Sequence, residues 1–217
     1  MAIVSSAPPA RAFHPIPPLE NGDHLTAKEF LRRYKAMPAV KKAELIQGIV
    51  SMASPVRSEQ HGKPDALIQT WLGSYAALHP SVQHRVNTTL RLGPDEVPQP
   101  DGLLFRIPEA GGRCTVDSDG YLCGPPELVV EIAASSVSRD AREKLVSYCR
   151  VEIAEYLLWR VEDEVIEWFH LAEDEYQLLP ANEFGVIESR MFPGLRLDVP
   201  AALRFDAAAL LAGLSGD

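Results

Sequence analysis

Cysteine is scarce in this sequence: 217 residues contain three, and none of them form the C-x-x-C spacing of a zinc cluster. The odd number also argues against a disulfide framework and favours a reducing compartment. A four-residue hairpin loop over residues 117–120 would place Cys114 directly opposite Cys123. Because thiols stay reduced in the cytosol, we expect no stable bridge between them.

Long apolar runs are also missing, since no stretch of eighteen or more apolar residues could span a membrane. The first twenty residues lack the basic start and the apolar core of a secretory signal. We therefore expect a cytoplasmic protein with no membrane partner. Five prolines between Pro8 and Pro18 predict a flexible N-terminal arm over residues 1–24. Residues 25–217 are enough for one domain with a single core.

Positive charge is not in excess, because the formal net charge is −9. Residues 152–175 hold nine acidic residues and one arginine, a net charge of −8, whereas residues 1–151 have a net charge of +1. The acidity is therefore concentrated towards the C-terminus, but no basic groove for tight, sequence-independent DNA binding is indicated. The densest basic cluster is typical of an ordinary solvated helix face: Arg32, Arg33, Lys35, Lys41 and Lys42.

One carboxylate lies inside an apolar run. Residues 128–134 are apolar except for Glu131 and follow a Gly-Pro-Pro turn, which predicts a strand buried on both faces. Alternation places Glu131 on the same face as Val129 and Ala133. An ionised carboxylate there is costly unless a cation, a metal ion or strong donors meet it. Taken alone, Glu131 fits a buried salt bridge as well as a functional site.

A second carboxylate, Asp101, stands at the start of another predicted strand. Pro100 cannot donate to a sheet, so this strand begins at or just after it and continues into apolar residues 103–105. Two carboxylates on neighbouring strands can share one hard divalent cation through oxygen ligands. The alternative is that Pro-Asp-Gly is simply a turn.

A helix is predicted over residues 139–150, after the Glu131 strand. Lys144 flanks its buried face, so the ammonium could curl back over the C-terminal end of that strand. The alternative is a lysine that extends its charge into water. The apolar stripe of this helix is Ala141, Leu145, Tyr148 and Cys149. Its candidate N-terminal caps are Ser135, Ser136 or Ser138.

The rest of the chain has the pattern of one α/β unit without repeats. Thr26 and Glu29 form a capping box for a helix that reaches about Ala36. The other expected elements are a hairpin over 44–52 that turns at Gln47-Gly48, a helix over 59–78, and strands over 84–90, 155–160 and 165–171. The expected core stripe of the long helix is Leu67, Ile68, Trp71, Leu72, Tyr75 and Leu78.

Five segments, in this order, resemble the Uma-type family of restriction endonucleases, within the PD-(D/E)XK nuclease superfamily. They are AELIQGIVSMA (43–53), SEQH (58–61), PQPDGLLF (98–105), PELVVEIAASSVSRDAREKLVSY (126–148) and VEIAEYLLWRV (151–161). The resemblance spans roughly residues 25–205. It implies an α/β (α+β) restriction-endonuclease-like domain, with a central mixed β-sheet flanked by helices.

Two departures from the superfamily pattern affect the site. The usual lysine of the superfamily would occupy position 133, which is Ala133 here, whereas the Uma-type family places it on the following helix, where Lys144 matches. The family also commonly has a Gly-Glu pair where this chain has Gly48-Ile49. Glu44 is therefore the remaining acidic residue of the first segment.

The resemblance also implies residue roles. Asp101 and Glu131 would bind Mg²⁺ or Mn²⁺, helped by the backbone carbonyl of Ile132. Lys144 would position or help deprotonate the attacking water, and Glu44 would orient the lysine or touch a second metal ion. Candidates for substrate contact are Gln99 and His61.

The implied function is a metal-dependent DNA endonuclease, expected as a homodimer because cutting both strands needs two sites. The alternative is a catalytically weak or inactive nuclease-fold module that binds a protein partner through its acidic C-terminal half. A third interpretation makes Asp101 and Glu131 the acid and base of a glycosidase. The aromatic content of 7% does not favour a sugar cleft, and this interpretation leaves Lys144 without a role.

Overall fold

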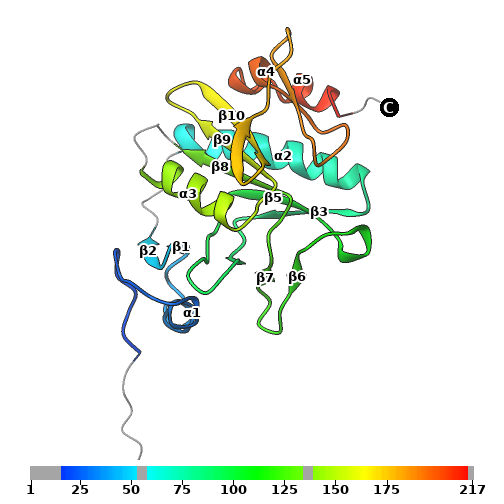
Figure 1. Cartoon of the computed structure of the whole chain (residues 1–217). Helices are drawn as coiled ribbons and strands as arrows, with labels where there is room; N and C mark the ends of the chain where they lie inside the picture. The colour runs from blue at the N-terminus through cyan, green and yellow to red at the C-terminus, as the bar shows by residue number, and fades with distance from the viewer. Residues whose placement is uncertain (1–15, 53–57, 134–138, 215–217) are drawn as a thin grey trace, which may run out of the picture.

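The computed structural model describes residues 16–52, 58–133 and 139–214, and their centre is a six-stranded β-sheet (Figure 1). Within this sheet β8 and β9 run parallel and the other neighbouring strands run antiparallel. The predicted fold class, a mixed sheet flanked by helices, is therefore confirmed. In spatial order the strands are β11 (Glu175–Leu178), β10 (Val165–Ala172), β9 (Glu155–Arg160), β8 (Leu128–Ala133), β5 (Gly102–Arg106) and β3 (Val82–Val86).

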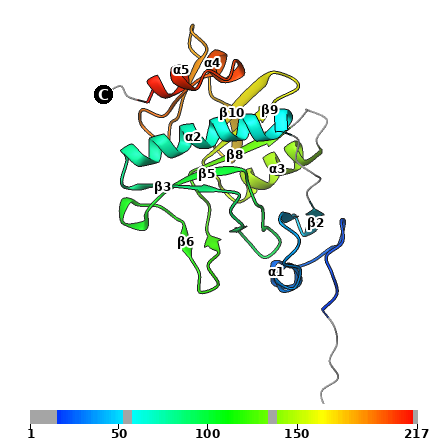
Figure 2. The same ribbon diagram turned by 180° about the vertical axis from the view of Figure 1, so that it is seen from behind.

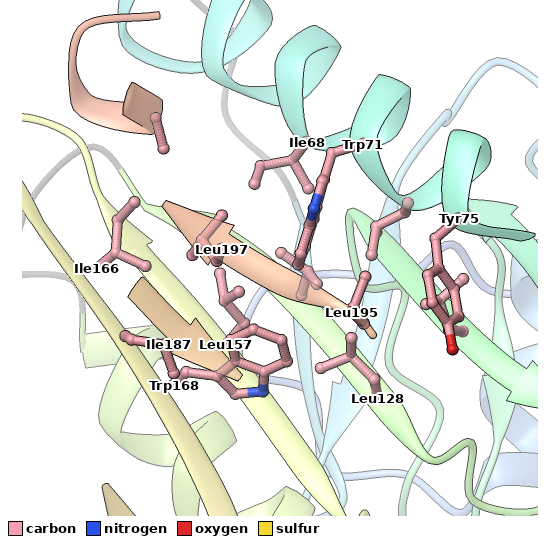
Figure 3. Packing of buried hydrophobic residues seen from close by; sticks show 14 of the residues in the cluster. Ile68, Trp71, Tyr75, Leu128, Leu157, Ile166, Trp168, Ile187, Leu195 and Leu197 are labelled. Atoms are coloured by element: carbon pink, nitrogen blue, oxygen red, sulfur yellow. The ribbon is translucent and has the colours of Figure 1, made fainter. Parts of the chain in front are cut away.

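One face of the sheet is covered by helix α2 (Lys63–Leu78), which runs across the strands in both views (Figures 1 and 2). Its Ile68, Trp71 and Tyr75 point into the largest hydrophobic cluster (Figure 3). Trp71 packs edge-on against Trp168 of β10, with ring centroids 5.8 Å apart. The C-terminal elements complete this cluster: β12 (Val186–Glu188), β13 (Arg196–Asp198), α4 (Val199–Leu203) and α5 (Ala207–Ala212).

The opposite face is covered by helix α3 (Arg139–Arg150), which confirms the predicted helix. Its Tyr148 is fully buried and packs edge-on against Tyr156 of β9, with ring centroids 5.3 Å apart. The candidate serine caps and the side chain of Ala141 lie outside the described part of the chain.

Strand β8 separates these two clusters by simple alternation. Val129 belongs to the α3 cluster, whereas Val130 and Ile132 belong to the α2 cluster. Glu131 therefore projects towards α3, as the alternation predicts.

A third hydrophobic cluster joins helix α1 (Ala27–Lys35) to the hairpin of β1 (Ala43–Ile46) and β2 (Ile49–Met52), beside the main sheet (Figure 1). The Thr26 hydroxyl accepts a hydrogen bond from the Glu29 N–H at 3.3 Å, so α1 begins where its cap predicts. Gln47 and Gly48 have φ values of 51° and 77°, as a two-residue hairpin turn requires. The predicted helix start and hairpin turn are confirmed, whereas the Glu29 carboxylate of the predicted capping box pairs with Arg32 and Arg33.

The described end of the predicted N-terminal arm contacts this hairpin. Leu19 is 3% exposed, His24 pairs with Ile49, and the Gly22 N–H donates to the Val50 carbonyl. No helix in the described ranges is long and apolar enough to cross a membrane.

Two predicted elements differ in extent. Helix α2 follows a π-helical turn over Ser58–Gly62, and its last residue, Leu78, is 60% exposed rather than part of the core stripe. The strand predicted over 84–90 is interrupted at Asn87, whose φ is 47°. Positive φ is incompatible with an extended strand, so the segment divides into β3 and β4 (Leu90–Arg91).

The predicted register around the cysteines is wrong by one residue. Strand β6 (Thr115–Val116) pairs with β7 (Leu122–Cys123), so that Thr115 rather than Cys114 lies opposite Cys123. The connecting loop has five residues instead of four. Both thiols are free, and that of Cys114 donates to the Gly124 carbonyl at 3.3 Å.

Candidate active site

The candidate site begins where the pairing of β5 with β8 ends. The last pair joins Gly102 to Val130. Continuing this register by two residues would pair Pro100 with Ile132, but proline has no backbone N–H to donate. The Ile132 N–H donates instead to Oδ2 of Asp101, at 2.8 Å. Proline therefore leaves the Ile132 carbonyl without a strand donor, and beyond Gly102 the Asp101 carboxylate accepts from the Ile132 N–H in place of a strand carbonyl.

The same register, continued by one residue, places Asp101 opposite Glu131. Opposite residues of antiparallel strands project from the same face, with Cβ atoms about 5 Å apart. Asp101 is 1% exposed and Glu131 is 6% exposed. The two acids therefore lie side by side on neighbouring strands and face α3, as the sequence predicts.

Lys144 reaches this pair from α3. Its Nζ lies 2.9 Å from Oε1 of Glu131 and 3.0 Å from Oε1 of Glu44, which arrives from β1. The lysine side chain is 8% exposed. The Lys144 ammonium therefore points towards Glu131, as predicted, and does not extend into water.

Two further groups hold the carboxylates that contact Lys144. The Tyr148 hydroxyl, one helical turn after the lysine, donates to Oε1 of Glu131 at 2.6 Å. The backbone N–H of Gln99 donates to Oε1 of Glu44 at 2.7 Å. The Gln99 side chain is buried and donates to the Asn87 carbonyl at 3.0 Å, so it is not presented at an open surface.

Two basic side chains contact Asp101. Nζ of Lys42 lies 2.9 Å from Oδ1, and Nε2 of His61 lies 3.3 Å from Oδ2. The expectation that Lys42 lies on a solvated helix face is wrong, because Lys42 directly precedes β1 and its ammonium contacts Asp101. The available signal was its two-residue spacing from Glu44, which places both side chains on one face of an extended segment.

A buried carboxylate, Glu96, fixes the hairpin relative to α3. Its side chain is fully buried, and Oε1 accepts from the Gln47 N–H at 3.1 Å and from the Arg150 guanidinium. The hairpin carries Glu44 and α3 carries Lys144. Glu96 therefore helps to set the distance between these two side chains.

Burial and neighbouring charges shift the pKa values of the ionisable groups in this site in different directions. Burial raises the pKa of Glu131 to about 7; the Lys144 ammonium opposes this rise, and the charges of Asp101 and Glu44 add to it. Burial would also raise the pKa of Asp101, but the hydrogen bond from His61 and the charge of Lys42 hold it well below its usual range. For Lys144, burial is outweighed by Glu131 and Glu44, which hold its pKa well above its usual range. Burial thus moves the pKa of Glu131 towards neutrality, in the direction opposite to the shift of Asp101.

On the α2 side, Gln69 holds the backbone of Asp101. Its Nε2 donates to the Asp101 carbonyl at 2.9 Å and to Oδ1 of Asp65 at 2.7 Å, and its Oε1 lies 2.8 Å from Nε2 of His84. A Cβ at position 102 would lie 3.0 Å from both polar atoms of this amide. Gly102 therefore leaves the room that Gln69 occupies.

Replacing Gly102 with alanine is expected to lower the free energy of unfolding by about 1–3 kcal/mol, because the added methyl group overpacks this contact. It should also slow any catalysis that depends on the position of Asp101. Urea denaturation measures the first effect. Gly62→Ala is the matched control, since a Cβ there meets nothing within 4 Å. Equal stability of the two variants would contradict this account of Gly102.

Among the described residues, no three or more histidine, cysteine, aspartate or glutamate side chains are arranged as a metal site. Mg²⁺ needs fewer protein ligands, since it usually binds one or two carboxylates and keeps several waters. Asp101 and Glu131 supply two such oxygens. The Ile132 carbonyl faces the same side of β8 as its N–H, towards Asp101, and Pro100 cannot bond to it. This set of hard oxygen donors fits Mg²⁺ or Mn²⁺.

Comparison with known proteins identifies the family and supports the fold. A family model, Uma2, described as "Putative restriction endonuclease", matches residues 27–200. The chain is also similar to a crystal structure from Anabaena variabilis ATCC 29413, described as a "putative nuclease belonging to DUF820". That likeness has a TM-score of 0.64 at 12% identity and covers 81% of this chain and 97% of the other, so it shows a shared fold. No curated protein matches the sequence. Because the family match covers most of the chain, this protein belongs to the Uma2 family.

Proposed function

We propose that this protein is a metal-dependent endonuclease that hydrolyses phosphodiester bonds of DNA through a PD-(D/E)XK-type site. The observation that carries the proposal is the convergence of Asp101, Glu131 and Lys144 at the point where the β5–β8 ladder ends. Family membership supports the reaction class.

Asp101, Glu131 and the Ile132 carbonyl are the proposed holders of Mg²⁺ or Mn²⁺. When bound, the ion would polarise the scissile phosphodiester and make water a better nucleophile. Burial of both carboxylates favours binding, because they have little solvation to lose when a cation arrives.

Lys144 is the residue proposed to stabilise the transition state. Glu131 and Glu44 keep its ammonium protonated and hold it from two sides, so it is aimed before substrate arrives. A fixed positive charge stabilises the negative charge that grows on the phosphate in the transition state. In this proposal Glu44 and Tyr148 act as positioning residues: one fixes the lysine and the other fixes Glu131.

The local charge supports binding of an anionic substrate despite the net charge of −9. Three carboxylates, Asp101, Glu131 and Glu44, face Lys42, Lys144 and His61. A divalent cation added to this cluster would make it net positive. We therefore expect DNA affinity to depend strongly on the metal ion and on salt.

Purified protein incubated with supercoiled plasmid is the direct test. Nicking or cutting is expected with Mg²⁺ or Mn²⁺ and none is expected with EDTA. A panel of duplex, single-stranded and branched DNA, with RNA, would identify the substrate form. Tight metal binding without cleavage of any of these would favour the inactive binding module instead. The homodimer is proposed only because two strands must be cut, and light scattering of the purified protein tests it.

Metal affinity is expected to rise with pH. Below about pH 7 Glu131 carries a proton that the cation must displace, and above it the carboxylate is already ionised. Affinity for Mn²⁺ should therefore fall by up to about tenfold per pH unit below that value. Calorimetry in two buffers of different ionisation enthalpy should show proton release near pH 6 and little near pH 8. An affinity that does not change with pH would contradict the role of Glu131 as a ligand.

A further inference from the structure

Lys42 occupies an unusual position for a lysine. Its ammonium lies 2.9 Å from Oδ1 of Asp101, a carboxylate whose side chain is 2% exposed, while 22% of the Lys42 side chain is exposed. The lysine stem therefore passes from the buried acid to the protein surface. Unlike Lys144, which contacts two carboxylates and is 8% exposed, Lys42 is seen in one ion pair within the described residues.

The two oxygens of Asp101 are held differently. Oδ2 accepts from the Ile132 N–H at 2.8 Å and lies 3.3 Å from Nε2 of His61. Removing Oδ2 from the Ile132 N–H would leave a buried backbone donor unpaired, which is costly. Oδ1 is held by Lys42. Of these contacts, the one to Lys42 can be released by rotation of a flexible, partly exposed side chain.

We propose that Lys42 neutralises Asp101 in the metal-free protein and that a divalent cation displaces its ammonium from Oδ1. This inference rests on the proposed function, since it takes Asp101 to be a metal ligand. Two positive charges within a few ångströms of one oxygen repel each other, so a bound cation and the Lys42 contact compete. Lys144 remains in place because Glu44 holds it independently of Glu131.

The competition gives Lys42→Met two opposite effects. Without metal, Oδ1 of Asp101 loses its contact with Lys42 and only the Oδ2 contacts described above remain, so the melting temperature should fall by roughly 5 °C. With metal, the cation no longer has to displace an ammonium, so Mn²⁺ affinity should rise about tenfold. Saturating Mn²⁺ should therefore remove most of the difference in melting temperature between the variant and the wild type.

The experiment compares wild type, Lys42→Met, Lys42→Arg and Lys41→Met by calorimetric titration with Mn²⁺ and by thermal unfolding with and without the ion, at physiological salt. Lys41→Met is the matched control, because it removes the same charge one residue away, where Nζ contacts the Pro38 carbonyl at 3.5 Å and no carboxylate among the described residues. It should change Mn²⁺ affinity less than twofold, since exposed charges are screened. Lys42→Arg keeps the charge and should bind Mn²⁺ about as the wild type does.

The outcomes separate this inference from the proposed function. Equal or weaker Mn²⁺ binding by Lys42→Met, with normal binding by the wild type, would overturn the inference and leave the nuclease proposal intact. A loss of melting temperature that Mn²⁺ does not restore would show a purely structural role and would also overturn it. No Mn²⁺ binding by the wild type would overturn both.

Discussion

Cleavage by the Lys144→Ala variant is expected to fall about 10³-fold at saturating metal, because a positioned cation of this kind contributes mainly to the transition state. Metal binding should survive, since the lysine is outside the proposed set of oxygen ligands. Single-turnover cleavage of a labelled duplex measures the first effect, and calorimetric titration with Mn²⁺ measures the second. The separation of the two effects distinguishes a catalytic lysine from one that only supports the fold.

Lys144→Ala is also expected to reduce stability, because it leaves Glu131 and Glu44 facing each other in a buried setting. Breaking a buried ion pair from one side costs about 3–5 kcal/mol, and urea denaturation measures it. Bound Mn²⁺ should recover part of this loss. Lys41→Ala is the control for a lysine outside the cluster. Wild-type cleavage rates in Lys144→Ala would remove the lysine from the mechanism.

Glu131→Ala is expected to lose both metal binding and cleavage, because it removes one of the two carboxylates proposed to hold the ion. Titration with Mn²⁺ and plasmid cleavage measure the two losses in the same preparation. Activity equal to that of the wild type would identify a contaminating nuclease as the source of cleavage. It would also end the assignment of the site.

The near-isosteric variant Glu131→Gln tests whether the loss of metal binding and cleavage comes from the missing carboxylate rather than from misfolding. The pKa of Glu131 is raised to about 7 in the folded protein, compared with about 4.3 in the unfolded chain. As the pH rises between these two values, ionisation of Glu131 favours the unfolded chain, so the wild type loses stability. Relative to the wild type, the metal-free Gln variant should therefore gain roughly 3 kcal/mol of stability between about pH 4.5 and pH 7, and little more above that. Urea denaturation at several pH values tests the sign. A difference that does not change with pH would contradict a raised pKa.

The central acids could be predicted from the sequence because their signals are local. Glu131 stands out as the one charge in an apolar run, and Pro100 marks where a strand must begin. The direction of the Lys144 side chain could not be predicted from the local sequence alone, since its position on the edge of an apolar stripe is compatible with either water or the core. The family resemblance, rather than helical spacing, chose between them.

Lys42 and Tyr148 could not be assigned in the same way. Lys42 lies in a basic stretch, and its partner Asp101 is 59 residues away along the chain. Tyr148 fits an apolar stripe, so its hydroxyl contact with Glu131 depends on how α3 is placed over β8. The break at Asn87 and the shifted register at Cys123 depend on single backbone conformations, which periodicity does not report.

The separate packing of the hairpin has a consequence for local opening. Glu44 lies on β1 and Lys42 directly before it, in the hairpin that packs with α1, whereas Glu131 lies on β8 of the six-stranded sheet and Asp101 directly precedes β5. Small packing units open at a lower free energy than the main core, and amide hydrogen exchange reports such openings. If the hairpin amides exchange before those of β8, the protein can lose two of its charged groups while most of the sheet remains protected. Loss of function on mild heating would then precede unfolding of the domain.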